Sequence, residues 1–188
     1  MENCNVNAVG AVRIVDADTG ELILSKQNAV HPRNLSYAIS RSLARETNGF
    51  IFKLAFGNGG TFYNSSATLV YRSPNTTGDA NLYNSTYEVQ VDDAASGTPE
   101  SNSVNSAAAT APSISALVVV TALLTAGEPS GQAAADNITT DSESAFTFDE
   151  IGLKTDDGSL LTHLVFSPIE KTANRAFAIT YTLTINVS

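Results

Sequence analysis

Two adjacent pairs of acidic residues, Asp149-Glu150 and Asp156-Asp157, are the side chains of this sequence best suited to acid–base chemistry. Glycoside hydrolysis uses two carboxyl groups placed on either side of the bond that is cleaved. The second pair, however, lies in a predicted turn, and the chain contains no tryptophan to form a platform for a sugar ring. A serine nucleophile of the Gly-x-Ser-x-Gly type is also absent. We therefore predict no catalytic residue and a protein that is not an enzyme.

Metal binding would draw on the two histidines, His31 and His163, and on the single cysteine, Cys4. A zinc site gathers several His or Cys ligands at one place, and neither histidine has a partner at ligand spacing. One cysteine alone excludes an internal disulfide and a cysteine-based zinc site. We predict no metal and no cofactor. We expect Cys4 to be a free thiol, with a disulfide between two copies as the alternative.

Two glycine-containing stretches have some of the residues of an ion-binding or phosphate-binding loop. Asp16-x-Asp18-x-Gly20 begins like a calcium loop, but position twelve holds Gln27 where the bidentate glutamate is needed. Gly57-Asn-Gly-Gly60 lacks the Gly-Lys-Ser/Thr of a phosphate loop and is followed by Thr-Phe-Tyr. Both stretches are therefore predicted to be tight turns between strands.

The net charge of −9 argues against nucleic acid as a partner, because phosphate binding needs clustered Lys and Arg. Three arginines, Arg33, Arg41 and Arg45, fall in one helical stretch and are predicted to form its solvated face. The N-terminus has no signal-peptide pattern. The longest apolar run, Ile114 to Leu124, is too short to cross a bilayer. We predict synthesis in a cytoplasm and no membrane partner.

Strands dominate the predicted elements that must position these side chains. Hairpins are expected at 11–26 and 145–168, the second across an Asp-Gly turn at 155–158. Apolar residues alternate strictly over 176–187, which indicates one buried face. Further strands are expected at 50–56, 68–71, 83–91 and 114–125. The predicted fold class is all-β, with about eight antiparallel strands in a β-sandwich or jelly-roll-like arrangement.

One α-helix is expected at 32–46, packed on the sheet, with Pro32 at its first position and Asn48-Gly49 as its stop. The length of 188 residues fits a single domain over 1–188. Residues 92–112 are rich in Ala, Ser, Asn and Gly, and are predicted to be an extended surface loop or arm. Together with the residues before Val6, this segment is a candidate for contacts with neighbouring copies.

Several stretches resemble virion proteins of tailed bacteriophages. In the first half of the chain these are Asn28-Ala-Val-His-Pro-Arg-Asn34, Leu54-Ala-Phe-Gly-Asn-Gly-Gly60 and Leu82-Tyr-Asn84. In the second half they are Phe148-Asp-Glu-Ile-Gly-Leu153, then Asp157-Gly158-x-Leu160-Leu-Thr162 and Ile169-Glu-Lys171. They cover roughly half of the sequence and are similar to a pattern found in tail, fibre-associated and other minor virion proteins. No single family is assigned and no functional residue is carried over.

The resemblance implies a non-enzymatic structural component of the virion, present in multiple copies on the capsid surface, the neck or collar, or the tail. Its partners would be copies of itself and other virion proteins. A carbohydrate- or receptor-binding module that contacts a host-surface glycan is the alternative. For that module the aromatic side chains would supply the contact surface; these are Phe62, Tyr63, Tyr71, Tyr83 and Tyr87.

Overall fold

The computed structural model describes residues 5–108, 115–130 and 145–187 and confirms the all-β fold class. Its single helix in this range is α1 (Pro32–Leu43). The strands are β1 (Val6–Asp16), β2 (Leu22–Val30), β3 (Ile51–Gly57), β4 (Thr61–Tyr63), β5 (Leu69–Tyr71), β6 (Ser85–Gln90), β7 (Ser103–Ala108), β8 (Ser115–Leu124), β9 (Ala145–Thr155), β10 (Thr162–Thr172) and β11 (Phe177–Val187). Both predicted hairpins and the final alternating strand are confirmed.

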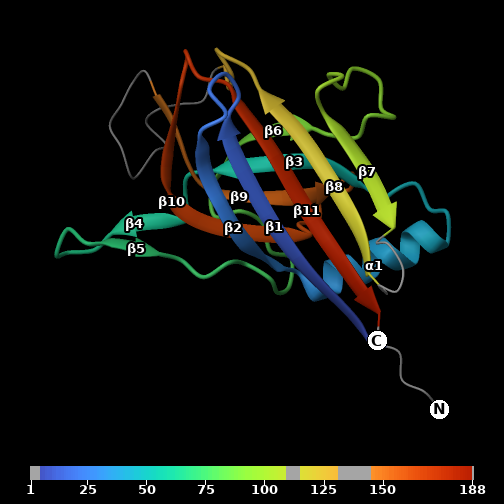
Figure 1. Cartoon of the computed structure of the whole chain (residues 1–188). Coiled ribbons are helices and arrows are strands. Elements are labelled where there is room, and N and C mark those ends of the chain that lie inside the picture. The colour runs from blue at the N-terminus through green and yellow to red at the C-terminus, as the bar shows by residue number, and fades with distance from the viewer. Residues whose placement is uncertain (1–4, 109–114, 131–144, 188) are drawn as a thin grey trace.

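Nine of the strands form one curled antiparallel sheet in the order β6-β3-β9-β10-β2-β1-β11-β8-β7 (Figure 1). The remaining two, β4 and β5, form a separate short hairpin. Eleven described strands exceed the expected number of about eight, and β4 and β7 are the two that were not predicted. The sheet is narrowest where β10 meets β2, since only Thr162↔Val30 and His163↔Ala29 pair there.

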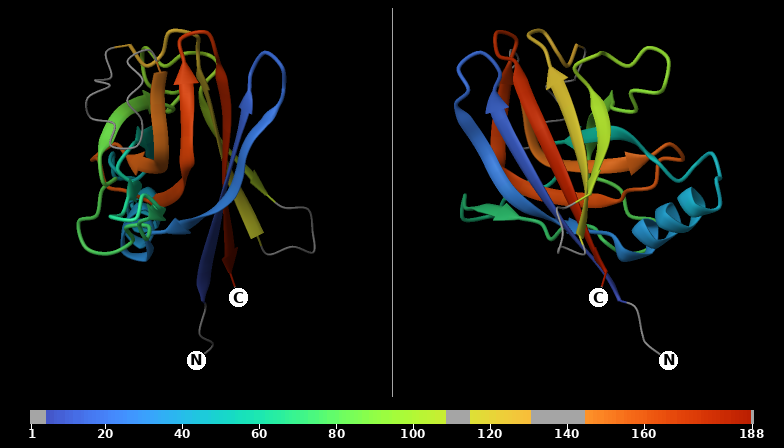
Figure 2. Two further views of the ribbon diagram at one scale, coloured as in Figure 1. Left: turned by 90° about the vertical axis from the view of Figure 1, so that its left-hand side faces the viewer. Right: turned by 45° about the vertical axis from the view of Figure 1, so that its right-hand side comes forward.

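The curled sheet folds its two halves over a common core. In Figure 2, β1, β11 and β8 lie on one side of the molecule and β3, β9 and β10 on the other. Alternate residues of β11 from Phe177 to Leu183 point inward and are at most 2% exposed. Among them, Tyr181 belongs to the same apolar cluster as Phe56 and Phe148, whose ring centroids are 4.9 Å apart. The two layers of the sandwich are therefore parts of one continuous sheet.

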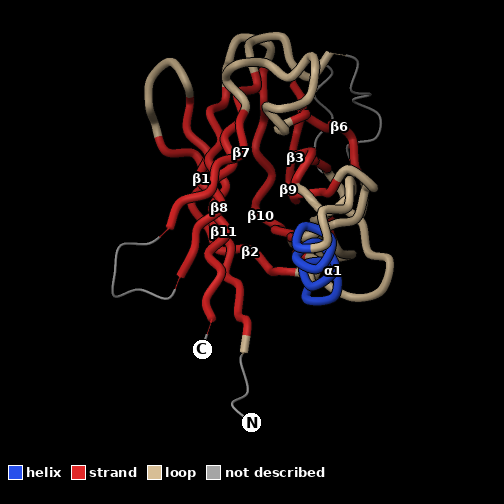
Figure 3. The backbone as a smooth tube through the Cα atoms, turned by 90° about the vertical axis from the view of Figure 1, so that its right-hand side faces the viewer, coloured by secondary structure: helices blue, strands red, loops and turns tan. Residues whose placement is uncertain are grey.

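Helix α1 begins where the sequence predicts and ends three residues before the expected Glu46. His31 is its N-cap, and the Nδ1 atom of His31 accepts a hydrogen bond from the Asn34 N–H. At the other end Arg45 adopts a left-handed conformation with φ of 59°, and the Glu46 N–H donates back to the Arg41 carbonyl. This pattern closes the helix before Asn48-Gly49 is reached. Figure 3 shows α1 at the end of the molecule where both termini lie.

The prediction of a loop over 92–112 is wrong for residues 103–108, which form β7 and pair with β8 at one edge of the sheet. Asn102 leads into this strand, and its side chain donates to the Gln90 carbonyl and accepts from the Leu123 N–H. The strand was missed because one apolar residue, Val104, gives no alternation to recognise. Residues 109–112, Cys4 and most of the N-terminal segment before Val6 lie outside the described residues.

Candidate functional site

Glu150 lies at the centre of a buried polar cluster on the β9 strand. Its carboxylate is 0% exposed and accepts three backbone hydrogen bonds, from Tyr83 at 2.9 Å, Asn84 at 2.7 Å and Gly59 at 3.2 Å. The Nε2 atom of His163 on β10 lies 3.0 Å from the carboxylate. We call these five residues the Glu150 node. A buried carboxylate with this many donors remains charged at low cost, because each oxygen is hydrogen-bonded.

The hydrogen bonds of His163 define which nitrogen carries its proton. Its Nδ1 atom accepts the Asn75 N–H at 2.8 Å, so a neutral ring carries hydrogen on Nε2 and donates it to Glu150. The ring of Tyr83 packs on the imidazole, with 5.7 Å between the ring centroids. Both ring nitrogens of His163 are therefore committed to holding neighbouring segments in place.

Asp149 points to the opposite face of the same strand and has its own set of donors. It accepts from Gly60 N–H at 2.8 Å, from Thr61 N–H at 2.7 Å and from the Thr61 hydroxyl at 2.5 Å. Asp149 is also 0% exposed. The two carboxylates of the Asp149-Glu150 pair consequently bind adjacent parts of the segment between β3 and β4 and do not face each other across a cleft.

The pKa values of these neighbouring carboxyl groups move in opposite directions. Burial raises the pKa of Asp149 above its ordinary value, although its hydrogen bonds to Thr61 and Gly60 oppose the change. Burial acts on Glu150 in the same sense, but the hydrogen bonds from His163 and from the Asn84 and Tyr83 backbone outweigh it and lower the pKa of Glu150. Glu150 is thus ionised at neutral pH and acts as a fixed anion for the backbone donors around it.

The glycines near the node are required by close packing. A Cβ atom on Gly57 would lie 2.3 Å from the Asn84 carbonyl oxygen and 2.5 Å from the Glu150 Oε1 atom. A Cβ on Gly152 would lie 2.4 Å from the Thr162 carbonyl oxygen. All three distances are far below van der Waals contact. The glycine cluster at 57–60, which has some features of a phosphate loop, therefore allows the backbone to pack closely against neighbouring backbone and against a buried carboxylate.

Three of the stretches that were singled out in the sequence meet at this node. They are Leu54 to Gly60, Leu82 to Asn84 and Phe148 to Leu153, and they come from separate parts of the chain. Sequence reasoning interpreted each as local turn or hairpin chemistry and did not predict that they touch. The one signal available was a pair of charged residues inside an otherwise apolar strand, which demands buried partners.

His31 holds the same loop as His163, from the other side. Its Nε2 atom lies 3.2 Å from the Gly78 carbonyl oxygen, and its Nδ1 atom is occupied by the helix N-terminus. Residues 72–84, between β5 and β6, are therefore tied down by both histidines, through Gly78 and Asn75. In the described residues no group of three or more His, Cys, Asp or Glu side chains is placed to hold a metal ion.

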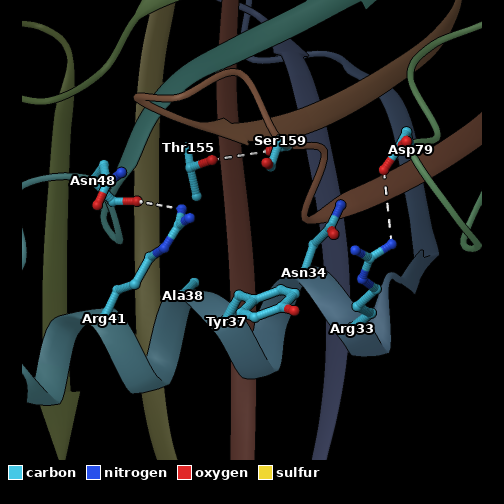
Figure 4. Close-up of a pocket in the computed structure, with 9 residues that line it drawn as sticks. All are labelled: Arg33, Asn34, Tyr37, Ala38, Arg41, Asn48, Asp79, Thr155 and Ser159. Carbon is cyan, nitrogen blue, oxygen red and sulfur yellow. Dashed lines mark hydrogen bonds and ion pairs between the residues drawn. The ribbon is translucent and has the colours of Figure 1, made fainter.

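A polar pocket of about 310 Å³ lies between α1, the 79–81 segment and the β9–β10 turn (Figure 4). Tyr37 is 50% exposed at its mouth, and the Arg33 and Arg41 guanidinium carbons lie 5.6 and 5.9 Å from its ring centroid. The Arg33 guanidinium nitrogen Nη1 lies 3.7 Å from the Asp79 carboxylate oxygen Oδ1. Arg41 pairs with Asp157 and donates to the Asn48 carbonyl at 3.2 Å. Arg33 and Arg41 thus line a pocket, whereas Arg45 lies beyond the end of α1 and is exposed.

Asp157 has a structural role in the β9–β10 turn. Its carboxylate accepts from the Thr155 hydroxyl at 2.5 Å and from the Ser159 N–H at 3.0 Å, besides its ion pair with Arg41. Burial would raise the pKa of Asp157, but these hydrogen bonds hold it well below its ordinary value. Asp157 therefore stabilises the predicted turn and links it to α1.

Asp16 has the same role in the β1–β2 turn. It accepts from the Thr19 and Asp18 N–H groups at 3.0 and 3.2 Å, and from Arg175 at 3.0 Å. The backbone hydrogen bond from Thr19 and the Arg175 guanidinium lower the pKa of Asp16 to about 2. The interpretation of 16–20 as a hairpin turn is confirmed.

The aromatic residues suggested as a sugar-binding surface are divided among different environments. Tyr87 packs on Phe56 in the core, with centroids 6.5 Å apart, and Tyr83 packs on His163. Tyr63 and Tyr71 lie exposed on the β4–β5 hairpin, at 55% and 47%. The Arg72 guanidinium lies over the rings of Phe62 and Tyr83, at 5.4 and 4.9 Å. Because Tyr87 packs against the core, the five side chains do not all belong to one exposed surface.

Comparison with known proteins adds no relative: no family model, no curated protein and no solved structure matches this chain. No helix in the described part of the chain is both long enough and apolar enough to span a membrane.

Proposed function

We propose that this chain is a non-enzymatic structural component of a bacteriophage particle, assembled in multiple copies on the capsid, neck or tail through protein–protein interfaces. The observation that carries the proposal is the Glu150 node. There the carboxylates best suited to acid–base catalysis are hydrogen-bonded to loop backbone. A catalytic carboxylate must reach a substrate within hydrogen-bonding distance. Glu150 and Asp149 are both 0% exposed and are surrounded by backbone donors.

The node also brings together in space several of the motifs on which the phage resemblance rests. Short motifs that are degenerate when considered one at a time become a single packing unit when they meet around Glu150. A Cβ atom on Gly57, Gly59 or Gly60 would lie less than 3.0 Å from an atom of Asn84, Glu150 or Asp149. This bracing suits a particle subunit, which has to keep its fold while neighbouring copies pack against it.

The experiment is to find the chain in a particle. Purified virions of the phage that carries the gene are analysed by mass spectrometry and by cryo-electron microscopy. We expect the chain at a fixed copy number in a symmetric ring or lattice, with neighbouring genes for portal, capsid or tail proteins. A chain absent from washed particles, or encoded apart from virion genes, contradicts the proposal.

A glycan-binding role is a second candidate, and the polar pocket of Figure 4 favours it. Tyr37 offers an exposed ring, and Asn34, Asn48 and the arginines offer hydrogen-bonding groups around it. A glycan array on purified protein tests this role, with Tyr37→Ala compared with Tyr63→Ala on the β4–β5 hairpin. Loss of a glycan signal in Tyr37→Ala alone would support the pocket, loss in Tyr63→Ala alone would transfer it to the hairpin, and no signal for any glycan would reject both.

A further inference from the structure

The end of the molecule beside α1 is apolar and open. Leu35, Ile39 and Leu43 form one stripe of the helix and line two grooves, one on either flank. The first groove, of about 560 Å³, lies between α1 and the start of β1 at Val6. The second, of about 430 Å³, lies between α1 and the strands β7, β8 and β11, and includes Ile185. Figure 1 shows α1 at this end, where β1 begins and β11 ends.

Large apolar side chains remain exposed around these grooves. Leu43 is 81% exposed, Val6 55% and Phe50 40%. Burying a leucine of this kind contributes about 1.5–3 kcal/mol, and a contiguous apolar patch on a protein surface marks an interaction site. The same end of the fold therefore has both a projecting side chain and grooves of a size to receive one.

The charge of the chain and of the groove linings bears on which protein can dock at this end. The chain carries a net charge of −9, so two copies repel each other wherever their acidic surfaces approach. None of the residues lining either groove is charged; the polar ones are serines and asparagines. A second copy can therefore dock here without placing like charges in contact, whereas a basic partner would find no carboxylate in the grooves to pair with.

We propose that this open end is the self-association surface of the chain, and that Leu43 of each copy enters an apolar groove of the other. A two-fold contact of this kind uses the same patch twice, and a projecting residue beside a groove is self-complementary in that sense. Val104 of the edge strand β7 lines the second groove, so the contact continues to the end of the sheet. The inference deepens the proposed function and rests on it, since a particle subunit acts in multiple copies.

The test measures the association of the purified full-length chain by sedimentation velocity from about 1 to 100 µM, a range that brackets typical specific contacts. We compare the wild type with Leu43→Asp and with Ser40→Glu, which adds a charge at an exposed position of the first groove. The matched control is Leu22→Asp, because Leu22 is a leucine that is 54% exposed at the opposite end of β1 and β2. Circular dichroism verifies the fold of each variant.

We expect a wild-type oligomer that both groove variants weaken on the order of tenfold to a hundredfold, while Leu22→Asp associates as the wild type does. A wild type that is monomeric at the highest concentration overturns the proposal, as does an oligomer that Leu43→Asp leaves intact or that Leu22→Asp disrupts equally. Particle analysis separates the two proposals. A monomeric chain that is nevertheless found in virions overturns the interface alone, and an oligomer with this variant pattern that is absent from virions overturns the virion role alone.

Discussion

The Glu150 node and the open end beside α1 differ in which kind of side chain is exposed to solvent. At the node, the Glu150 carboxylate and the His163 ring are fully buried, and each is matched by a donor or acceptor from the same chain. At the open end, apolar side chains such as Leu43 remain in water with no such match. A buried charge without its donors costs several kcal/mol, so the first region has to be complete within one chain. An exposed leucine costs far less free energy, so the monomer tolerates the open end without a partner.

The comparison indicates where each region has its effect. Changes at the node should reduce the stability of the monomer, because its hydrogen bonds connect segments that are distant in sequence. Changes at the open end should leave that stability almost untouched and alter association instead. The following predictions test this division, and each is checked by the free energy of unfolding from urea titration at low protein concentration.

Glu150→Ala should give the largest loss, about 3–5 kcal/mol, because it leaves three buried N–H groups and the Nε2–H of His163 without an acceptor. Glu170→Ala, an exposed glutamate on β10, is the control and should cost less than about 0.5 kcal/mol. Equal losses for the two glutamates would show that the node does not brace the fold.

Gly57→Ala should cost about 3 kcal/mol, since its Cβ would collide with the Asn84 carbonyl and the Glu150 carboxylate. Gly78→Ala is the control: it has a positive φ of 64° but no atom within 4 Å of the added Cβ. That variant should cost about 1 kcal/mol, the strain of a left-handed alanine. A Gly57→Ala protein as stable as Gly78→Ala would remove the close-packing explanation.

Acid should weaken the node through Glu150. Because the pKa of Glu150 is lower in the folded chain, its contribution is fully present above the ordinary glutamate value and is lost as the pH falls through the folded value. Each unit of lowering corresponds to about 1.4 kcal/mol. Asp149 acts in the opposite sense, because a raised pKa favours proton uptake by the folded state as the pH falls.

The measurement for this pH prediction is the free energy of unfolding of the wild type and of Glu150→Gln from pH 7 to pH 3. The wild type should lose more stability than the variant over this range, since only the wild type has the titrating group. Parallel curves would mean that Glu150 has no lowered pKa and that the acid sensitivity arises elsewhere.

Leu43→Gln should have the smallest effect, within about 0.5 kcal/mol, because the side chain is 81% exposed and loses little contact in the monomer. Leu35→Gln on the same stripe, where the leucine is only 9% exposed, should cost about 2–4 kcal/mol. A loss of similar size for Leu43→Gln would place Leu43 in the monomer core and blur the contrast between the two regions.

Sequence reasoning located most elements because the signals for them are local. The alternation over 176–187 predicts β11 to within one residue, and the Asp-Gly turn at 155–158 places the β9–β10 hairpin. It missed β4, which has only three residues, and β7, whose pattern is weak. It also extended α1 to Glu46, because it relied on Asn48-Gly49 as the stop while Arg45 takes the left-handed position instead. Short or weakly patterned elements depend on neighbours that the local sequence does not reveal.

The sequence by itself determined that this chain is an antiparallel β protein with a helix after the first hairpin, since side chains on a strand alternate and turns need particular residues. Only the tertiary structure decided what the conspicuous residues do. Glu150 accepts hydrogen bonds from Gly59 and Asn84, which are 91 and 66 residues away in the sequence. Both histidines form hydrogen bonds with the loop over 72–84. Contacts at such separations follow from how the sheet curls, and the curl is a property of all nine strands together.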